Sequence, residues 1–292
     1  AVTTAPAPAA PRAGLGPAGA ALCVLAALLI GFAANLTVLG HLQHARDQST
    51  AYDELREQLA LGTAPVGQTT YDGRAVAPGA PVALLRVPVL GLREVVAEGT
   101  TSQVLMSGPG HRRDTPLPGQ AGTAVVMGRQ WGYGSPFNDL HRLPPGARVE
   151  VTTGQGEAVY EVTGVRRPGD PKPAAAREGE GRLTLVTADG GAYTPEDFLF
   201  VDAKLLSDVR PSPARPLRPG WITDAEKPLA GDPAAWPKIF LGAQALLVAA
   251  VLTVAARRRW GPRQTWIAAT PVLVALGVLV SGELTRLLPN LL

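Results

Sequence analysis

Three long apolar runs constrain this chain more than any other feature of its sequence. They cover residues 18–42, 239–256 and 266–288, and the first contains only Asn35, Thr37 and His41 as polar side chains. About 20 apolar residues in a helix cross a bilayer core of roughly 30 Å, so each run predicts a transmembrane helix. A cleaved signal peptide is the alternative for the first run. Its apolar region is usually about 7–15 residues long, so we expect a retained anchor.

The charges between these runs predict the orientation of the chain. Residues 257–265 contain Arg257, Arg258, Arg259 and Arg263, and short arginine-rich loops between spans stay in the cytoplasm. Counting spans back from this loop places residues 1–17, an Ala- and Pro-rich tail expected to be disordered, in the cytoplasm as well. The sequence therefore predicts a plasma-membrane protein with three spans, whose middle segment lies outside the cytoplasm.

The middle segment has the pattern of a small β-domain. Short strand-like stretches separated by Gly- and Pro-rich turns lie at residues 82–88, 93–97, 123–128, 148–153, 157–165, 182–188 and 198–203. This succession is typical of a small barrel or sandwich, and we assign it to residues 81–208. A juxtamembrane helix and loose linker are expected over residues 43–80, and a Pro-rich linker over residues 209–238.

Composition and charge exclude several function classes. The formal net charge is only +3, and no basic run is interleaved with aromatic residues, which disfavours nucleic-acid binding. Cys23 is the single cysteine and lies within the first apolar run, so neither an intrachain disulfide nor a cysteine-rich metal site is expected. No cofactor is predicted.

Two charged residues at the end of the last apolar run are three positions apart. Glu283 and Arg286 can therefore share one face of a helix. We expect an ion pair near the outer membrane surface, with a polar contact to a membrane partner as the alternative.

Residues 182–190 read as a buried strand that runs into a polar turn. Leu183, Leu185 and Thr187 alternate with Thr184 and Val186, and Asp189-Gly190 is expected to end the strand. A strand end is a rigid place to present a reactive side chain. The residue at this end is Ala188, whose methyl group can neither donate, accept nor attack.

Short motifs across the strand-rich segment occur in a recognisable order. They are Val87-Pro88-Val89-Leu90-Gly91-Leu92, Val95-Val96-Ala97-Glu98-Gly99-Thr100, Gly108-Pro109-Gly110-His111, Leu117-Pro118-Gly119-Gln120, Val125-Val126-Met127-Gly128, Tyr133-Gly134-Ser135-Pro136-Phe137-Asn138-Asp139-Leu140 and Leu183-Thr184-Leu185-Val186-Thr187. In this order and spacing the segment resembles the sortase family, most closely the housekeeping-type, class E-like sortases of actinobacteria.

The resemblance implies an eight-stranded β-barrel held on the outer face of the membrane of a Gram-positive bacterium. It also implies acyl transfer, in which a cysteine thiolate cuts a C-terminal sorting signal and an amine resolves the thioacyl enzyme. While the thioacyl enzyme forms, a histidine protonates the leaving amine, and an arginine holds the substrate and the developing oxyanion.

The three family positions hold other residues in this chain. Arg129 follows Gly128 where the histidine would stand, and arginine stays protonated at physiological pH. Ala188 replaces the cysteine. The arginine position falls at the start of the last strand, where Phe198 or Glu196 stands instead. An engineered change would explain Ala188 alone, so loss of the whole set predicts a natural pseudosortase with no catalytic residue.

No replacement nucleophile or metal site stands out. Thr187 is expected to face the barrel interior, and Ser107 and Ser135 have no partnered base in the sequence pattern. His111 lies in the Gly-Pro-Gly-His motif, where packing or lining of the groove is the expected role. The other histidines lack a second ligand at metal spacing, so no zinc site is predicted.

We therefore predict a binding or scaffolding module at the cell surface. The groove that would bind substrate in an active member of the family would here be lined by His111, Arg129, Gln130, Trp131, Thr187, Asp189, Glu196 and Asp197. Its partner would be an active sortase, a sorting-signal peptide or another membrane protein. The alternatives are an active transpeptidase or hydrolase with relocated residues, and a structural spacer beneath the cell wall.

Overall fold

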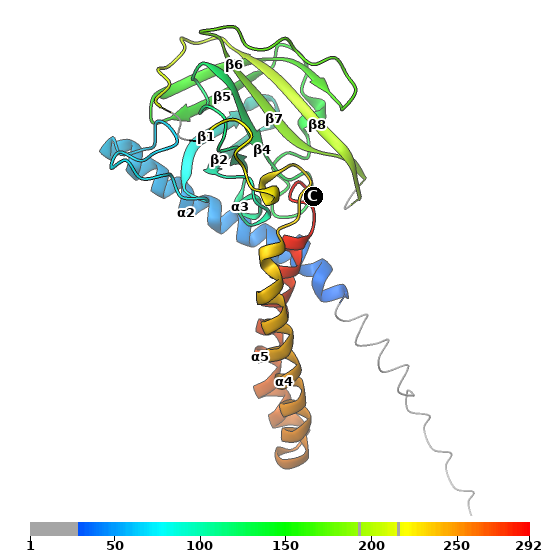
Figure 1. Cartoon of the computed structure of the whole chain (residues 1–292). Coiled ribbons are helices and arrows are strands. Elements are labelled where there is room, and N and C mark those ends of the chain that lie inside the picture. Colours follow the sequence, from blue (N-terminus) through cyan, green and yellow to red (C-terminus); the bar gives the residue numbers. More distant parts are fainter. Residues whose placement is uncertain (1–28, 192–193, 215–216) are drawn as a thin grey trace, which may run out of the picture.

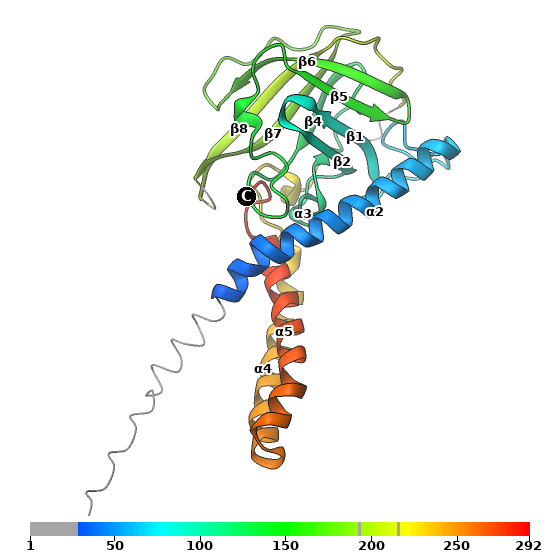
Figure 2. The same cartoon turned by 180° about the vertical axis from the view of Figure 1, so that it is seen from behind.

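A closed eight-stranded barrel forms the centre of the molecule. The computed structural model describes residues 29–191, 194–214 and 217–292, and its strands follow one another around the barrel in the order β1-β2-β3-β4-β7-β8-β6-β5 (Figures 1 and 2). Their bounds are β1 Pro81–Val87, β2 Leu92–Glu98, β3 Gly110–His111, β4 Gly122–Met127, β5 Arg148–Thr153, β6 Gly156–Arg166, β7 Gly181–Gly191 and β8 Thr194–Leu205. The predicted mainly-β fold with an eight-stranded barrel is confirmed.

The barrel core is built by the inward faces of these strands. Val82, Leu85, Val151, Tyr160 and Leu183 are fully buried in one apolar cluster. Alternation of buried and exposed residues is clear in β5 and β6, whereas β1 and β7 are buried on both faces. The β1 strand is covered on its outer face by a helix, which explains its continuous apolar sequence.

That helix is α2, Gly40–Leu61, which lies along the outside of the barrel (Figure 2). Leu55 packs in a buried cluster with Leu84 and Val95. The side-chain amide of Gln48 bonds both backbone groups of Val95, accepting from its N–H at 2.7 Å and donating to its carbonyl at 3.1 Å. The helix predicted next to the membrane is therefore docked on the barrel.

The first predicted span, residues 18–42, begins outside the described residues. Its described part is helical from residue 29, with a π-helical turn at Asn35–Leu39 that leads into α2. Leu36 is buried in one cluster with Met106 and Tyr133 of the barrel domain. Continuous apolar sequence was interpreted as lipid-facing, but the end of this run packs against protein. The described residues contain two helices long and apolar enough to cross a membrane, where the sequence analysis expected three.

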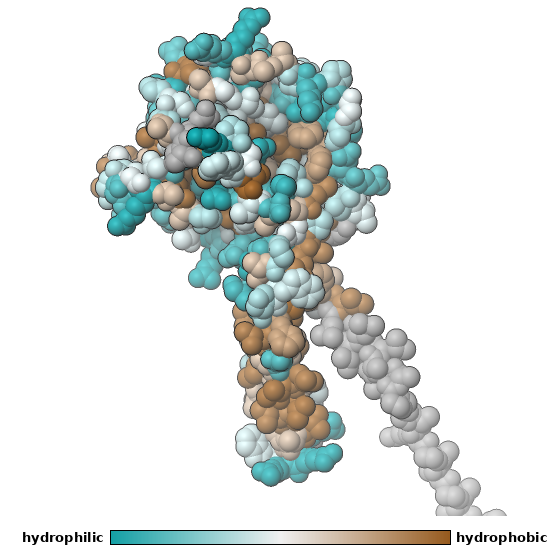
Figure 3. Space-filling view, in the orientation of Figure 1, coloured by the Kyte–Doolittle hydropathy of each residue, from teal (hydrophilic) through white to brown (hydrophobic). Residues whose placement is uncertain are grey.

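Those two helices are α4, Trp236–Trp260, and α5, Pro262–Leu287. They form a hairpin that projects from the barrel, with an apolar surface and a hydrophilic far end (Figures 1 and 3). Three of the arginines expected in a loop over residues 257–265 instead lie in the last turn of α4, Arg263 lies in the first turn of α5, and the helices meet at Gly261. Arginine is a good helix former and is favoured at a helix C-terminus, which accounts for the longer helix.

The segment expected to be a linker over residues 209–238 is fastened to the barrel. Gly220 donates its N–H to Asp114, and the Arg113 guanidinium donates to both carboxylate oxygens of Glu226 at 2.6 and 2.7 Å. Short helical turns at Asp224–Glu226 and Pro233–Ala235 precede α4. The connector therefore fixes the start of the helical hairpin beneath the barrel.

The end of α5 is tied to the same connector. Arg286 pairs with Glu283 at 2.8 Å, as the spacing predicts, and also with Asp232 of the connector. The backbone N–H of Asp232 donates to the carbonyl of Arg286 at 2.8 Å. The polar contact that was an alternative for a membrane partner is made within the chain.

Candidate functional site

The positions singled out by the sequence lie at one end of the barrel. β4 and β7 run parallel, with Met127 opposite Val186, and Gly128 donates its N–H to the Val186 carbonyl at 3.0 Å. Arg129, which comes after β4, and Ala188, near the end of β7, therefore lie at the same end of two paired strands. Phe198 lies directly opposite Ala188 in the antiparallel ladder of β7 and β8.

The Arg129 side chain is buried at this end, with 1% of its surface exposed. Its Nη2 donates to the Ser102 hydroxyl at 2.8 Å, and its Nη1 donates to the backbone oxygen of Leu292 at 2.9 Å. Its guanidinium also lies 5.3 Å from the centre of the Tyr133 ring.

Burial lowers the pKa of Arg129 to about 10, so the side chain remains charged at neutral pH. Among the described residues no side-chain carboxylate pairs with this guanidinium, and Nε has no hydrogen-bond partner. A buried guanidinium without such a partner is costly, and the oxygens of Ser102 and the main-chain oxygen of Leu292 compensate for part of that cost.

Ala188 lies inside a longer strand than the sequence predicts. The expected turn at Asp189-Gly190 is only an irregularity in pairing, and β7 continues to Gly191. The Ala188 methyl group is 1% exposed and belongs to an apolar cluster with Leu105, Met127, Val186 and Leu291. Position 188 is therefore covered by protein and not presented at an open turn.

The hydroxyl groups near this end are engaged in hydrogen bonds. Thr187 is buried, and its Oγ1 donates to the carbonyl of Gly128 at 2.9 Å. Ser102 is fully buried beside the Arg129 guanidinium. Ser135 lies in a turn with φ of 50°, and its hydroxyl is 3.5 Å from the Gly132 carbonyl.

The other residues expected in the groove are dispersed. Gln130 follows Arg129 and donates its backbone N–H to the Leu291 carbonyl at 2.9 Å, and Trp131 comes next in the same loop. Asp189 forms an ion pair with Arg167, 2.5 Å from its Nε. Glu196 and Asp197 lie near the tip of the β7–β8 hairpin, where Glu196 is exposed.

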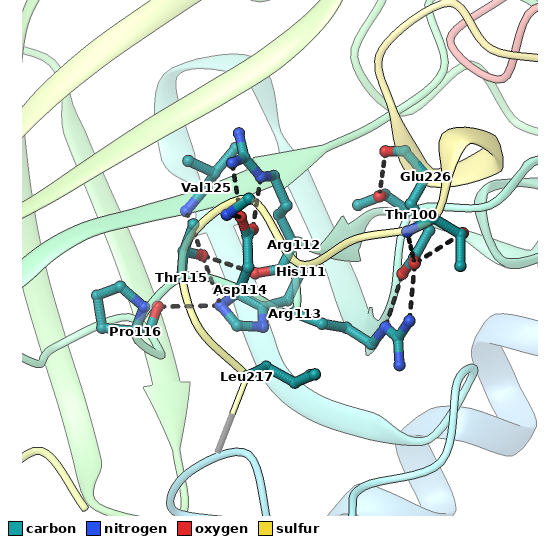
Figure 4. A network of polar contacts seen from close by, with 12 residues as sticks. Thr100, His111, Arg112, Arg113, Asp114, Thr115, Pro116, Val125, Leu217 and Glu226 are labelled. Atoms are coloured by element: carbon teal, nitrogen blue, oxygen red, sulfur yellow. Dashed lines mark hydrogen bonds and ion pairs between the residues drawn. The ribbon is translucent and has the colours of Figure 1, made fainter. Parts of the chain in front are cut away.

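His111 belongs to a separate buried polar network (Figure 4). Its Nδ1 lies 2.9 Å from Glu98, and its Nε2 lies 2.9 Å from the Pro116 carbonyl and 3.1 Å from the Thr115 hydroxyl. Burial opposes the charged form, but the Glu98 carboxylate and the Pro116 carbonyl outweigh it and raise the pKa of His111. Both ring nitrogens face acceptors, an arrangement that favours the protonated imidazole.

The sequence analysis missed the residues that fill the site. Asn290 donates its side-chain amide to the carbonyls of Thr100 and Lys227, and Leu291 packs in the Ala188 cluster. These contacts join segments far apart along the chain, for which a single sequence carries no signal. Among the described residues, no three His, Cys, Asp or Glu side chains are grouped to hold a metal ion.

Comparison with known proteins identifies the barrel. Residues 85–205 match the family model described as a sortase domain. Sortase E from Streptomyces avermitilis is 31% identical, with a TM-score of 0.38, and the match covers 45% of this chain and 91% of that chain. A point mutant of the same enzyme matches at 33% identity with a TM-score of 0.37, over 45% of this chain and 91% of that chain. A sortase D5 transpeptidase from Clostridium perfringens is 22% identical with a TM-score of 0.45, over 56% of this chain and 99% of that chain. No curated protein matches the chain.

Proposed function

The chain belongs to the sortase family through residues 85–205, and we propose that it is a membrane-anchored, noncatalytic member that binds peptide or protein segments at the cell surface. Acyl transfer by this family requires a thiolate, a proton donor and an oxyanion-holding cation near one strand end. The corresponding positions carry Ala188, Arg129 and Phe198. The loss of all three side-chain functions supports a binding role.

The single observation that carries the proposal is the contact between Arg129 and a peptide backbone. The guanidinium and the neighbouring Gln130 N–H donate to the carbonyl oxygens of Leu292 and Leu291, both at 2.9 Å. This end of the barrel thus holds a turn of the chain through its main-chain oxygens. Such contacts provide affinity without chemistry.

An enzyme with relocated residues is less well supported. Glu98, His111 and Thr115 follow one another in hydrogen-bond reach, as a carboxylate, an imidazole and a hydroxyl. However, Thr115 donates its hydroxyl to the Arg112 carbonyl at 2.7 Å, and His111 Nε2 also contacts the Pro116 carbonyl. The Thr115 hydroxyl proton therefore points away from the imidazole, and this geometry does not suit His111 as a base for Thr115.

The helical hairpin supports anchoring and suggests where a partner would bind. α4 and α5 expose apolar side chains along most of their length, and one such helix would suffice to tether a domain. We propose that the barrel lies outside the cytoplasm, that the arginine-rich end of the hairpin lies inside, and that an active sortase, a sorting-signal peptide or another membrane protein is the partner.

The test compares turnover with binding in the purified full chain in detergent. We expect no cleavage or amine transfer with sorting-signal peptides. Turnover that disappears with Thr187→Val, Ser135→Ala or His111→Gln would establish the enzyme instead. In pull-downs from membranes we expect a specific partner that is lost with Arg129→Ala and retained with Arg142→Ala, a matched exposed arginine. A barrel that captures no partner would favour the structural spacer.

A further inference from the structure

The segment Pro289–Leu292, which follows α5, turns back against the barrel (Figures 1 and 2). Asn290 and Leu291 are fully buried and Leu292 is 4% exposed. A chain segment just after a helix is usually exposed unless specific contacts hold it. The burial of this segment therefore requires an explanation in terms of the surface that receives it.

The surface that receives it contains the vacated positions. The Leu291 side chain packs in the cluster of Leu105 from α3 (Ser102–Ser107), Met127 from β4, and Val186 and Ala188 from β7. Phe198 and Leu229 pack against the same cluster. The small side chain of Ala188 thus lies in the same apolar cluster as Leu291.

Polar contacts fix the main chain and one side chain of the segment. Asn290 donates its backbone N–H to the Ala230 carbonyl at 2.9 Å, and its side-chain Nδ2 to the carbonyls of Thr100 at 2.8 Å and Lys227 at 3.0 Å. Its two following carbonyls accept from Gln130 and Arg129. An asparagine amide can donate to two buried carbonyls at once, whereas apolar or acidic residues in its place cannot.

We propose that this end of the barrel is a peptide-binding groove selective for an Asn-Leu-Leu segment, and that residues 290–292 of the same chain are its resident ligand. The inference rests on the proposed binding function and names its ligand class: an uncharged, turn-forming segment with an amide side chain followed by an apolar one, like residues 289–292, whose turn is closed by the Leu292 N–H donating to the Pro289 carbonyl at 3.1 Å. Arg129 and Gln130 bind main-chain oxygens, the Thr100 and Lys227 carbonyls select the amide, and the cluster around Ala188 selects leucine.

A tethered ligand competes strongly with a free one. Attachment through α5 and the Asp232–Arg286 contact holds the segment near its groove, and short tethers give effective concentrations of about a millimolar. The wild-type groove should therefore exclude added peptide. A binding partner must bring a better segment or displace α5.

The test uses the full chain in detergent micelles and a fluorescent peptide with the sequence of residues 288–292. Leu291→Asp in the protein places a charge in the apolar cluster and should empty the groove. We expect the peptide to bind this variant at least about tenfold more tightly than wild type, as measured by fluorescence anisotropy. Asn290→Ala is a second variant that weakens the resident segment without adding charge.

Peptide variants test the selectivity. Replacing the peptide's asparagine by alanine, or its first following leucine by aspartate, should weaken binding to the emptied groove about tenfold or more. Equal binding of the tail peptide to wild type and both protein variants would show that the segment is not the occupant. An emptied, folded groove that binds a peptide of unrelated sequence equally well would reject the Asn-Leu-Leu selectivity but keep the binding function. An emptied, folded groove that binds neither peptide would reject both.

Discussion

Ala188 and Phe198 face each other across the ladder of β7 and β8, and the buried cluster around them contains Leu291 from the end of the helical hairpin. This arrangement joins the barrel to the helical hairpin beside position 188. The segment that follows α5 therefore covers the position that the resemblance to sortases singled out.

A cysteine restored at position 188 should be inert. In a Cys23→Ser background we expect Ala188→Cys to give no acyl transfer, because Arg129 cannot act as a proton shuttle and Phe198 cannot hold an oxyanion. The thiol should also react slowly with maleimide. Each 1.4 kcal/mol needed to open the site slows labelling about tenfold.

An exposed thiol is the control for this experiment. Glu196→Cys, at the exposed tip of β8, should label rapidly. Adding Leu291→Asp should accelerate labelling of Ala188→Cys without changing that of Glu196→Cys. Equal labelling of both cysteines in the wild-type background would contradict the covered position.

The connector should control access to the site through Gly231. A Cβ at Gly231 would lie 2.4 Å from the carbonyl oxygen of Leu287, so Gly231→Ala must displace the end of α5 or the connector. Overpacking of this kind costs roughly 1–3 kcal/mol. We expect a lower thermal midpoint and faster labelling of Ala188→Cys.

Gly277→Ala is the matched control, because a Cβ there has no neighbour within 4 Å in the described structure. Alanine is the better helix former, so this change should leave stability equal or slightly higher. If the two substitutions had the same effect on labelling, the docking of α5 on the connector would not control access to position 188.

The barrel was predictable because its strands carry local signals. Residues 148–153 were predicted to form a strand and coincide with β5, and the other predicted strands match observed ones within a few residues. β3 was missed because two residues, Gly110 and His111, are too few to show alternation. Residues 136–143 form only one short helical turn, Leu140–Arg142. Asn138 and Asp139 favour caps and turns over a helix interior, which accounts for this short element.

Only part of the candidate site could be predicted from the sequence. The resemblance to sortases implied that Arg129, Ala188 and Phe198 belong to one site, and the parallel pairing of β4 and β7 brings the first two to one end of the barrel. For the segment Pro289–Leu292, the sequence pattern indicated only that a transmembrane helix ends just before it. Its hydrogen bond from Arg129 to Leu292 spans 163 positions, and hydrophobic periodicity carries no information on such a contact.

Stability should depend on pH through His111. Its pKa is raised in the folded state, so the folded protein binds this proton more tightly than the unfolded chain does. The resulting stabilisation is complete below the unfolded pKa of about 6.5 and is lost as pH rises through the folded pKa. The free energy of unfolding should therefore fall with increasing pH above this value, by at most about 1.4 kcal/mol per pH unit. Thermal midpoints should fall with it.

His111→Gln should flatten that slope and destabilise the protein at low pH, because Glu98 then lacks a cationic partner in a buried network. His141 lies in an exposed turn, where its ring contacts the Asn138 carbonyl, and His141→Gln serves as the control. A midpoint profile that is the same in wild type and His111→Gln would show that another group titrates.

Arg129 should distinguish charged from neutral peptide ends. A peptide that ends at the position of Leu292 presents either a carboxylate or a neutral amide to a buried guanidinium that lacks a carboxylate partner among the described residues. Hydrogen bonds to charged groups are worth about 1.5–3 kcal/mol, so the free acid should bind the Leu291→Asp variant roughly tenfold more tightly than the amide. Since burial lowers the pKa of Arg129 only to about 10, the preference should persist from about pH 6 to about pH 9.

Arg129→Met should abolish this preference for the free acid, and Arg142→Met should not. Equal affinity for acid and amide, measured by anisotropy across this range, would mean that Arg129 serves the groove only as a hydrogen-bond donor.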